Sequence, residues 1–361
     1  MDEPRNAAFL GGLPIAADPT TIDRVLTELW GPASDTEHGA SRLALGTIVI
    51  GAEERDAAVV EGYCQRLAAV YPCRMIVVLV GDEPELRATI QATCRPATEG
   101  GPLVCGETIV LRTRLADEQR LPGIILPLLL PDVLATLWWC LRQAPTQVAR
   151  TEVLPLIDRL LVDSNSSEAS LELLALQAEW PATADLTWFA QRSWREAVAQ
   201  LFDAEPAASA EVDRLAIITA SRHQPGAVEA ALLGGWAAGQ LGWKPAHRAG
   251  DGHSTWRRPD GSTGHVDLTW NGQQVPRNSC AVQALTLSAD SGEWVWRVSQ
   301  HDGPHTSLAL EARRNGISQV PRLLPLDVLD PVDEVLAALE RPLRNDTRTR
   351  TARYASWLLG G

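Results

Sequence analysis

The alternation of strand-like and helix-like segments between residues 43 and 179 constrains the fold more than any other feature of this sequence. Met75–Val80 is an uninterrupted apolar run between Pro72 and Gly81, which is typical of a strand buried on both faces. Strand and helix alternate with short connections, so we predict an α/β domain with a largely parallel sheet. The pattern predicts strands at 43–50, 75–80, 104–113, 133–139 and 160–163, and helices at 18–30, 53–70, 83–94, 147–156 and 168–179.

The pattern changes after Pro181. A strand at 215–219 and an Ala- and Gly-rich helix at 226–240 precede three runs in which apolar and polar residues alternate. Asn271-Gly272 lies between the first two runs and predicts a tight hairpin turn. Two helices are expected to close the chain, the first capped by Asp330 with Pro331 at its first position.

These features predict an α+β C-terminal domain with an antiparallel meander and terminal helices. We place the domain boundary near Ala182, which divides the chain into an N-terminal domain, 1–182, and a C-terminal domain, 183–361. Pro206 is the alternative boundary.

The charge balance limits the partners of the chain. Thirty-two Lys and Arg against 45 Asp and Glu give a formal net charge of −13, which argues against nucleic acid or an anionic membrane as the main partner. The apolar run 121–139 is interrupted by three prolines and Asp132, so we interpret it as a buried segment and not as a membrane span. The N-terminus has no apolar stretch followed by a cleavage site, which predicts a cytoplasmic protein.

The carboxyl ends of the predicted parallel strands are where such a sheet would bind a ligand. Gly81-Asp82 and Asp163–Ser166 would lie there, which leaves open a nucleotide- or sugar-phosphate-binding enzyme or sensor. The sequence nevertheless contains no GxGxxG, GxxxxGK[ST], GxSxG or HExxH, so the layout is Rossmann-like without a cofactor fingerprint. Asp251, His253 and Asp267 could form an acid–base set, but no nucleophile accompanies them. We predict no catalytic residues, no cofactor and no metal.

Tryptophan is the most informative residue type, because 13 Trp accompany only three Phe and three Tyr. Truncated tryptophans at protein interfaces typically cost about 2 kcal/mol or more. Trp138 and Trp139 are adjacent, so on a strand their rings would face opposite sides. The stretch 185–203 contains Trp188 and Trp194, and Ser193 with Glu196 forms a capping-box pattern that predicts a helix start.

Several segments together resemble one known family. DLTW at 185–188, LLLPDVLATLWW at 128–139, DRLLVDS at 158–164 and LLGGWAAGQLGW at 232–243 occur in the order of the motifs of the glucose-6-phosphate dehydrogenase assembly protein family (OpcA). YPCRMIVV at 71–78 also resembles a family strand, with Cys73 where serine is usual, and Ala135 stands where a proline is usual. The similarity runs over roughly residues 40 to 357.

This resemblance implies a non-catalytic cytosolic protein that binds glucose-6-phosphate dehydrogenase, promotes its active oligomer and raises its substrate affinity in the oxidative pentose phosphate pathway. In photosynthetic members of the family the activation is linked to thioredoxin, which makes thioredoxin a second candidate partner. None of the six cysteines forms a CxxC pair, and Cys73 and Cys94 are the redox candidates. A scaffold for another oxidoreductase is a further alternative. The candidate partner-binding residues are Trp138, Trp139, Asp185, Trp188, Trp194 and Arg195.

Overall fold

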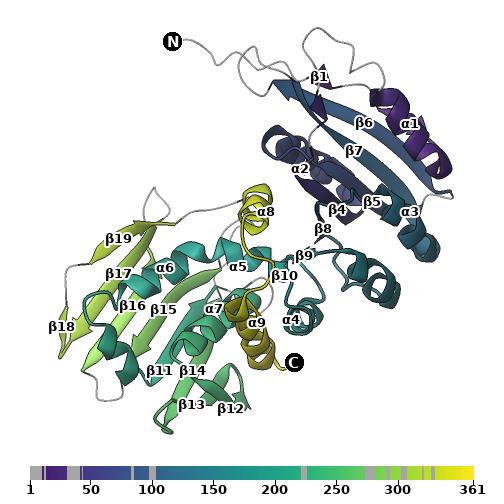
Figure 1. Cartoon of the computed structure of the whole chain (residues 1–361). Helices are drawn as coiled ribbons and strands as arrows, with labels where there is room; N and C mark the ends of the chain where they lie inside the picture. The colour runs from purple at the N-terminus through teal and green to yellow at the C-terminus, as the bar shows by residue number, and fades with distance from the viewer. Residues whose placement is uncertain are drawn as a thin grey trace, which may run out of the picture. The chain divides into compact units, whose positions relative to one another are not determined.

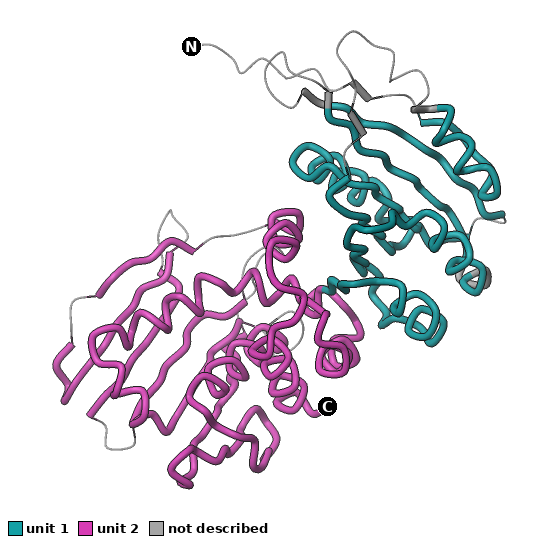
Figure 2. The backbone as a smooth tube through the Cα atoms, in the orientation of Figure 1, with its two compact units in different colours: residues 1–162 teal, residues 163–361 magenta. Residues whose placement is uncertain are grey.

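The chain forms two compact units, 1–162 and 163–361 (Figure 2). The predicted boundary near Ala182 falls after α4 (Ser170–Glu179), but α4 packs against α9 (Asp346–Leu359) and so belongs to the second unit. The computed structural model describes residues 10–11, 14–30, 41–42, 44–82, 85–96, 103–220, 226–272, 281–289, 293–301, 307–318, 321–326 and 330–361.

The first unit is built on a largely parallel sheet, as predicted. Its parallel strands β4 (Gly46–Glu53), β5 (Arg74–Gly81), β7 (Leu103–Arg114), β8 (Leu134–Trp139) and β9 (Arg159–Val162) lie in the order β7-β5-β4-β8-β9. Counted along the chain, this order is 3-2-1-4-5, which is the strand order of dinucleotide-binding folds. The short strands are β1 (Leu10–Gly11) and β2 (Ile15–Ala17), which pair antiparallel with β6, and β3 (Ser41–Arg42), which pairs parallel with β7.

Helices cover both faces of this sheet (Figure 1). Helix α2 (Ala57–Val70), preceded by the short η3 (Glu54–Asp56), connects β4 to β5, and α1 (Ile22–Trp30) contacts β6. The apolar run 121–139 divides into α3 (Leu121–Leu128) and β8, and no described helix is long and apolar enough to cross a membrane. Short helical segments complete the unit: η1 (Pro19–Thr21), η4 (Leu115–Arg120), η5 (Ala149–Val153) and η6 (Leu154–Leu156).

The predicted helix at 83–94 is wrong, because this segment contains the strand β6 (Arg87–Pro96), antiparallel to β7. Ala88 and Ile90 are buried while Thr89 and Gln91 are half-buried, which is the two-residue period of a strand. Ten residue pairs with β7 therefore override the helical pattern.

The second unit contains a mostly antiparallel sheet in the order β12-β13-β14-β11-β15-β16-β17, in which only β11 and β14 are parallel. The predicted hairpin at Asn271-Gly272 is wrong, because β11 lies between the two strands that it would join. The strands are β11 (Arg214–Thr219), β12 (Lys244–Gly250), β13 (His253–Arg257), β14 (Thr263–Trp270), β15 (Val282–Ser288), β16 (Trp294–Gln300) and β17 (Ser307–Arg314), with β18 (Ile317–Ser318) and β19 (Arg322–Pro325) paired to β17.

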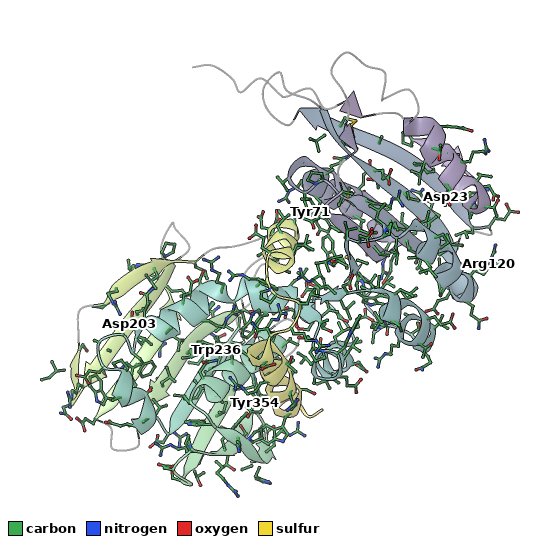
Figure 3. The ribbon with its side chains drawn as sticks, in the orientation of Figure 1. Asp23, Tyr71, Arg120, Asp203, Trp236 and Tyr354 are labelled. Carbon is green, nitrogen blue, oxygen red and sulfur yellow. A yellow bond between two sulfur atoms is a disulfide. The ribbon has the colours of Figure 1, made fainter. Side chains whose placement is uncertain are left out.

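Helices α6 (Arg192–Gln200), α7 (Gly226–Gln240) and α9 pack on one face of this sheet (Figure 1). Their core includes Trp194, Trp256 and Trp296, which are at most 2% exposed. Trp236 of α7 and Tyr354 of α9 extend this packing (Figure 3), and the Tyr354 hydroxyl donates to Trp243 O at 3.0 Å.

Local hydrogen bonds set the starts of the remaining helices. Asp330 accepts from the backbone N–H of Val332 at the start of α8 (Pro331–Leu339), as predicted. The predicted start at Ser193 is wrong: α5 (Leu186–Ala190) begins after the cap Asp185, and α6 follows it from Arg192. The short η7 (Pro206–Glu211) and β10 (Thr183–Asp185) complete the unit.

The close approach of β7 to the start of β5 gives a test of the first unit. A Cβ added at Gly106 would lie 2.8 Å from Cys73 O, whereas a Cβ at Gly62 in α2 would meet nothing within 4 Å. We expect Gly106→Ala to lower the free energy of unfolding by about 1–3 kcal/mol because backbone must move. Gly62→Ala should raise it by about 0.5–1 kcal/mol because alanine favours a helix. Chemical denaturation of both variants measures these changes; equal stabilities would contradict the packing of β5 and β7.

Candidate functional site

Two of the motif segments, DRLLVDS and DLTW, meet in a buried polar cluster of the second unit, the Asp185 hub. Asp185 is 1% exposed, and it is also the cap of α5. Its Oδ1 accepts from Ser164 N at 3.2 Å and from Thr187 N at 3.1 Å, and its Oδ2 accepts from Gln177 Nε2 at 2.7 Å. One carboxylate therefore joins the end of the DRLLVDS segment, α4 and the start of α5.

Asp163 holds the neighbouring turn of the hub. Its Oδ1 accepts from Asn165 N at 3.1 Å, Ser166 N at 3.3 Å and Thr187 Oγ1 at 2.9 Å. The residues at 163–166, a predicted ligand position, are thus engaged with their own backbone and with the DLTW segment. Asp82, the other predicted ligand position, is exposed after the end of β5.

Helix α7 joins the hub through Glu229. Its Oε1 accepts from Asn165 Nδ2 at 2.9 Å, and its Oε2 accepts from Ala281 N at 2.6 Å. The backbone carbonyl of Glu229 accepts from Gln191 Nε2 at 2.7 Å. The hub therefore connects segments that lie more than a hundred residues apart in the sequence, from 163 to 281.

Burial raises the pKa values of two carboxyl groups in this region. The pKa of Asp185 is raised to about 6, mainly by desolvation. The pKa of Glu334 in α8 is raised to about 9 by burial first, then by the negative charges of its neighbours, of which Asp163 and Asp185 contribute most. Within the described ranges no group of three or more His, Cys, Asp or Glu side chains is placed to hold a metal ion. We therefore interpret the hub as a structural element.

Four of the predicted partner-binding residues are buried within the chain. Asp185 and Trp194 are 1% and 0% exposed. Trp138 is 2% exposed and stacks on Tyr63, with ring centroids 5.2 Å apart. Trp139 is 9% exposed, and its Nε1 donates to Gln143 O at 2.7 Å. Their side chains are engaged in packing, so they do not form an exposed surface.

Trp188 and Arg195 are the two predicted residues that are only half-buried. The Arg195 guanidinium lies 3.7 Å from the centroid of the Trp188 ring, and its Nη1 donates to Trp188 O at 2.5 Å. Desolvation lowers the pKa of Arg195 to about 9. A cation stacked on an indole is attracted by the ring quadrupole, so the two side chains hold each other in place.

Carboxylates and ion pairs stand at the edge of the first unit where such folds bind a dinucleotide. In folds with this strand order the pyrophosphate lies at the start of the helix that follows the first strand, here η3 and α2. Glu53, Glu54 and Asp56 stand there, and carboxylates repel phosphate. Glu54 Oε1 accepts from Arg112 Nε at 3.1 Å, and Glu53 pairs with Arg55.

A groove of about 900 Å³ lies beside α2 on the same unit. A right-handed crossover between the parallel neighbours β5 and β7 would place a helix next to α2. The segment that connects β5 to β7 instead contains the strand β6, which pairs with the far side of β7. We attribute the groove to this missing helix. Its lining includes Arg66, Gln91, Thr93, Thr108 and Arg112.

The redox candidates have different environments. Cys94 lies opposite Cys105 on the β6–β7 pair and forms a disulfide with it (Figure 3). Cys73 is 1% exposed, and burial raises the pKa of its thiol to about 12, so it is a poor nucleophile. The sequence concealed the disulfide because the helical interpretation of 83–94 did not place Cys94 opposite Cys105. Cys280 lies outside the described residues.

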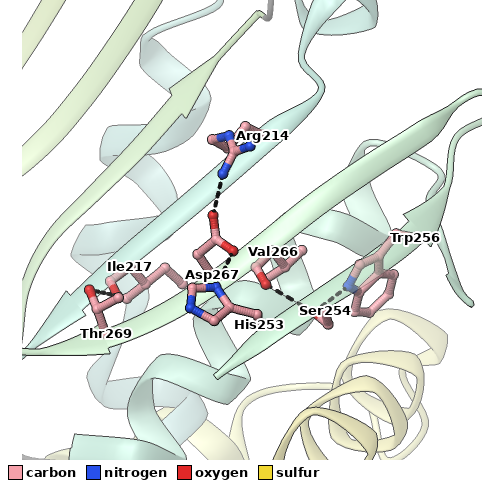
Figure 4. Close-up of polar contacts among 8 residues, drawn as sticks. All are labelled: Arg214, Ile217, His253, Ser254, Trp256, Val266, Asp267 and Thr269. Carbon is pink, nitrogen blue, oxygen red and sulfur yellow. Dashed lines mark hydrogen bonds and ion pairs between the residues drawn. The ribbon is translucent and has the colours of Figure 1, made fainter. Parts of the chain in front are cut away.

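Of the acid–base candidates, the structure brings His253 and Asp267 together (Figure 4). His253 Nδ1 lies 2.8 Å from Asp267 Oδ1, and Arg214 Nη1 donates to Asp267 Oδ2 at 2.8 Å. Neither hydrogen bond involves Asp251. The His253 and Arg214 side chains are 59% and 50% exposed, so the group is a surface ion-pair network.

Several members of the region were not predicted from the sequence, among them Gln177, Glu229 and Glu334. Glu229 was detectable in principle, because it is the only charged residue of the apolar helix α7. Gln177 and Glu334 lie in amphipathic helices, where polar residues are expected, so the sequence contains no signal for their burial.

Fold and site together define a two-domain α/β protein with a dinucleotide-fold strand order whose phosphate edge carries carboxylates and ion pairs. Two family models match the chain: the glucose-6-phosphate dehydrogenase subunit N-terminal domain over 64–178 and the corresponding C-terminal domain over 181–347. The chain therefore belongs to the glucose-6-phosphate dehydrogenase assembly protein family (OpcA).

Curated relatives and solved structures show further similarity. The "Putative OxPP cycle protein OpcA" of Synechocystis sp. is 30% identical over 193 residues, covering 51% of this chain and 40% of the relative. The protein of the same name from Synechococcus elongatus is 30% identical over 190 residues, covering 50% and 42%. The chain thus aligns with about two fifths of each relative. An oxidoreductase from Sinorhizobium meliloti has a TM-score of 0.46 at 11% identity, covering 87% of this chain and 96% of that one.

The raised pKa of Glu334 predicts a specific pH dependence of stability. Folding raises this pKa from 4.5 to about 9, so the native state binds the proton more tightly than the unfolded state. Its contribution to stability is fully present below about pH 4.5 and is lost as the pH rises toward 9. Glu334→Gln keeps the neutral form at every pH, so its Tm should exceed that of the wild type near pH 8 and converge with it near pH 5. Thermal unfolding across this range measures the effect.

The exposed Glu340, which is the C-cap of α8, provides a control of the same residue type. Glu340→Gln should leave the pH dependence of the Tm unchanged. A Glu334→Gln variant whose Tm follows the wild type at every pH would contradict the protonated state of this carboxyl group.

Proposed function

We propose that this chain is a non-catalytic assembly factor and allosteric activator of glucose-6-phosphate dehydrogenase. It promotes the active oligomer of the dehydrogenase and raises its substrate affinity in the oxidative pentose phosphate pathway of the cytoplasm. The observation that carries this proposal is the match of two family models, both described as glucose-6-phosphate dehydrogenase subunit domains, over 64–178 and 181–347.

Two regions of the structure support this proposal: the start of α2 and the Asp185 hub. The carboxylates of Glu53, Glu54 and Asp56 disfavour a dinucleotide phosphate at the start of α2. The carboxylate oxygens of Asp185 accept hydrogen bonds from other residues of the same chain. These features are those of a protein that acts through its surface on another catalyst.

An activator of this kind is constrained by linkage. It can raise the substrate affinity of the dehydrogenase only if it binds the competent state of that enzyme better than the other state. An effect of 5- to 150-fold requires a difference of about 1–3 kcal/mol.

Reciprocity gives the test. Glucose 6-phosphate should tighten the complex between this chain and the dehydrogenase by the same factor by which the chain raises glucose 6-phosphate affinity. Titration of the labelled chain into the dehydrogenase, with and without the sugar phosphate, measures both factors. An unchanged Kd alongside increased substrate affinity would break the linkage, and no binding at all would remove the proposed partner.

A small-ligand enzyme or sensor is the second candidate, and the groove beside α2 is the observation that favours it. Its size is within the range of small-molecule sites, and Arg66, Arg112 and Glu61 are charged residues of its lining. A thermal shift with nucleotides or sugar phosphates that disappears in Arg66→Ala would favour this alternative. A pull-down that yields a different oxidoreductase as main partner would favour the scaffold alternative.

Trp188 and Arg195 remain our candidates for direct contact with the dehydrogenase, because they are the only half-buried members of the predicted set. Half-buried aromatic and arginine side chains are the residue types most enriched at energetic centres of interfaces.

The Cys94–Cys105 disulfide is our proposed redox element, with thioredoxin as its reductant. A thioredoxin dithiol would reduce the disulfide to two thiols and would itself be oxidised to a disulfide. Cys94 is half-buried while Cys105 is 0% exposed, so attack would take place at Cys94.

We expect the Kd for the dehydrogenase to differ between the oxidised and the thioredoxin-reduced chain. The double variant Cys94→Ser/Cys105→Ser should lose this difference, whereas Cys140→Ser, which keeps the disulfide, should retain it. Titrations before and after reduction measure the response. A response that persists in the double variant would exclude this disulfide.

A further inference from the structure

The sheet of the second unit has two faces of opposite character. The inner face, under α6, α7 and α9, carries large apolar side chains such as Leu215, Leu287 and Trp296, at most 2% exposed. The outer face is set by the strand register, because directly paired residues point to the same side. One row across it is His253, Asp267, Ala216, Thr286, Arg297 and Glu311, from β13 to β17.

The middle of this outer face carries mostly small side chains, and Arg297 of β16 is the charged residue among them. β11, β15 and β16 contribute side chains there that are short or β-branched, so the surface has low relief. They are the half-buried Ala216, Ile218, Thr286, Ser288, Val295 and Ser299; Ala284 has the same orientation but is buried. A centre with small side chains and an arginine, but without Lys, Asp or Glu, fits the composition of an interface core.

Charge gathers toward the margins of the face, and it is mostly positive. On the described strands β11 to β17, five cations stand against two carboxylates, although the chain as a whole carries −13. The carboxylates are engaged: Asp267 pairs with Arg214 and His253, and Glu311 lies opposite Arg297. The cations are Arg214, Lys244, Arg257, Arg297 and Arg313, and three of the seven histidines, His247, His253 and His265, share the face.

The size of the face suits a specific interface. Strands lie about 4.8 Å apart and rise about 3.3 Å per residue, so six strands of about seven residues cover on the order of 650 Å². A standard interface buries about 800 Å² per partner. The face can therefore supply most of one side of such an interface.

We propose that the outer face of this sheet docks an acidic surface of a protein partner. Its net positive charge disfavours a second copy in the same orientation, because two such faces would repel. It favours a partner surface rich in Asp and Glu around an uncharged centre. The identification of that partner as the dehydrogenase rests on the function proposed above.

Charge reversal at the margins tests the docking face. In the full chain, Arg257→Glu/Arg313→Glu should weaken binding to the dehydrogenase by about tenfold or more, mainly through slower association, and should reduce its salt dependence. Arg344→Glu/Arg353→Glu is the matched control, because it changes the net charge equally at exposed positions that do not belong to the outer face. Binding kinetics at low and physiological salt give the comparison, and thermal unfolding checks the fold.

A steric variant tests the centre without a change of charge. Thr286→Trp places a large ring between Ala216 and Arg297 and should abolish docking while the Tm stays near that of the wild type. The proposal is overturned if both face variants bind as the wild type does, or if the control weakens binding as much as Arg257→Glu/Arg313→Glu.

Three further outcomes separate the proposals. Sedimentation of the chain alone, showing a dimer that the face variants dissociate, would overturn the acidic partner in favour of a second copy. A wild-type chain that does not bind the dehydrogenase would refute the proposed function. If the wild type binds the dehydrogenase, and Trp188→Ala weakens binding while the face variants do not, the proposed function would stand and the docking face would be overturned.

Discussion

The burial of the Asp185 carboxylate is the interaction on which the second unit depends. A carboxylate this deep in the protein is costly unless its oxygens accept hydrogen bonds, and Asp185 receives them from Ser164, Thr187 and Gln177. The desolvation that these bonds offset also raises its pKa. Because the donors come from three segments, the carboxylate fixes where α4, α5 and the turn at 163–166 lie together.

In the first unit, the strand order is that of a dinucleotide-binding fold while the phosphate edge carries carboxylates, because strand order and edge chemistry depend on different residues. Strand order follows from apolar strands and right-handed crossovers, which do not depend on the residues after the first strand. The edge depends on those residues, and here they are Glu53 and Glu54, paired with arginines. A fold that commonly hosts cofactor chemistry can therefore serve as a framework for surfaces, since function resides in sites and not in folds.

An interface on the outer sheet face would be consistent with this division of roles. The inner face supplies stability through Trp194, Trp256 and Trp296, and the Asp185 hub holds the helices that cover it. The outer face contributes little to the core, so its composition is free to be set by a partner. Its bias toward cations on an acidic chain is the kind of departure that core packing does not require.

The sequence by itself determined the fold class of both units and most of their elements. Hydrophobic periodicity and helix caps such as Asp330 involve residues that are close in the sequence, so they can be recognised from the sequence alone. Tertiary structure decided the rest, because pairing between distant segments is not local. It made residues 87–96 a strand beside β7, inserted β11 between β14 and β15, and paired Cys94 with Cys105. It also buried Trp138, Trp139 and Trp194, since burial depends on which faces meet and not on the hydrophobicity of the residue.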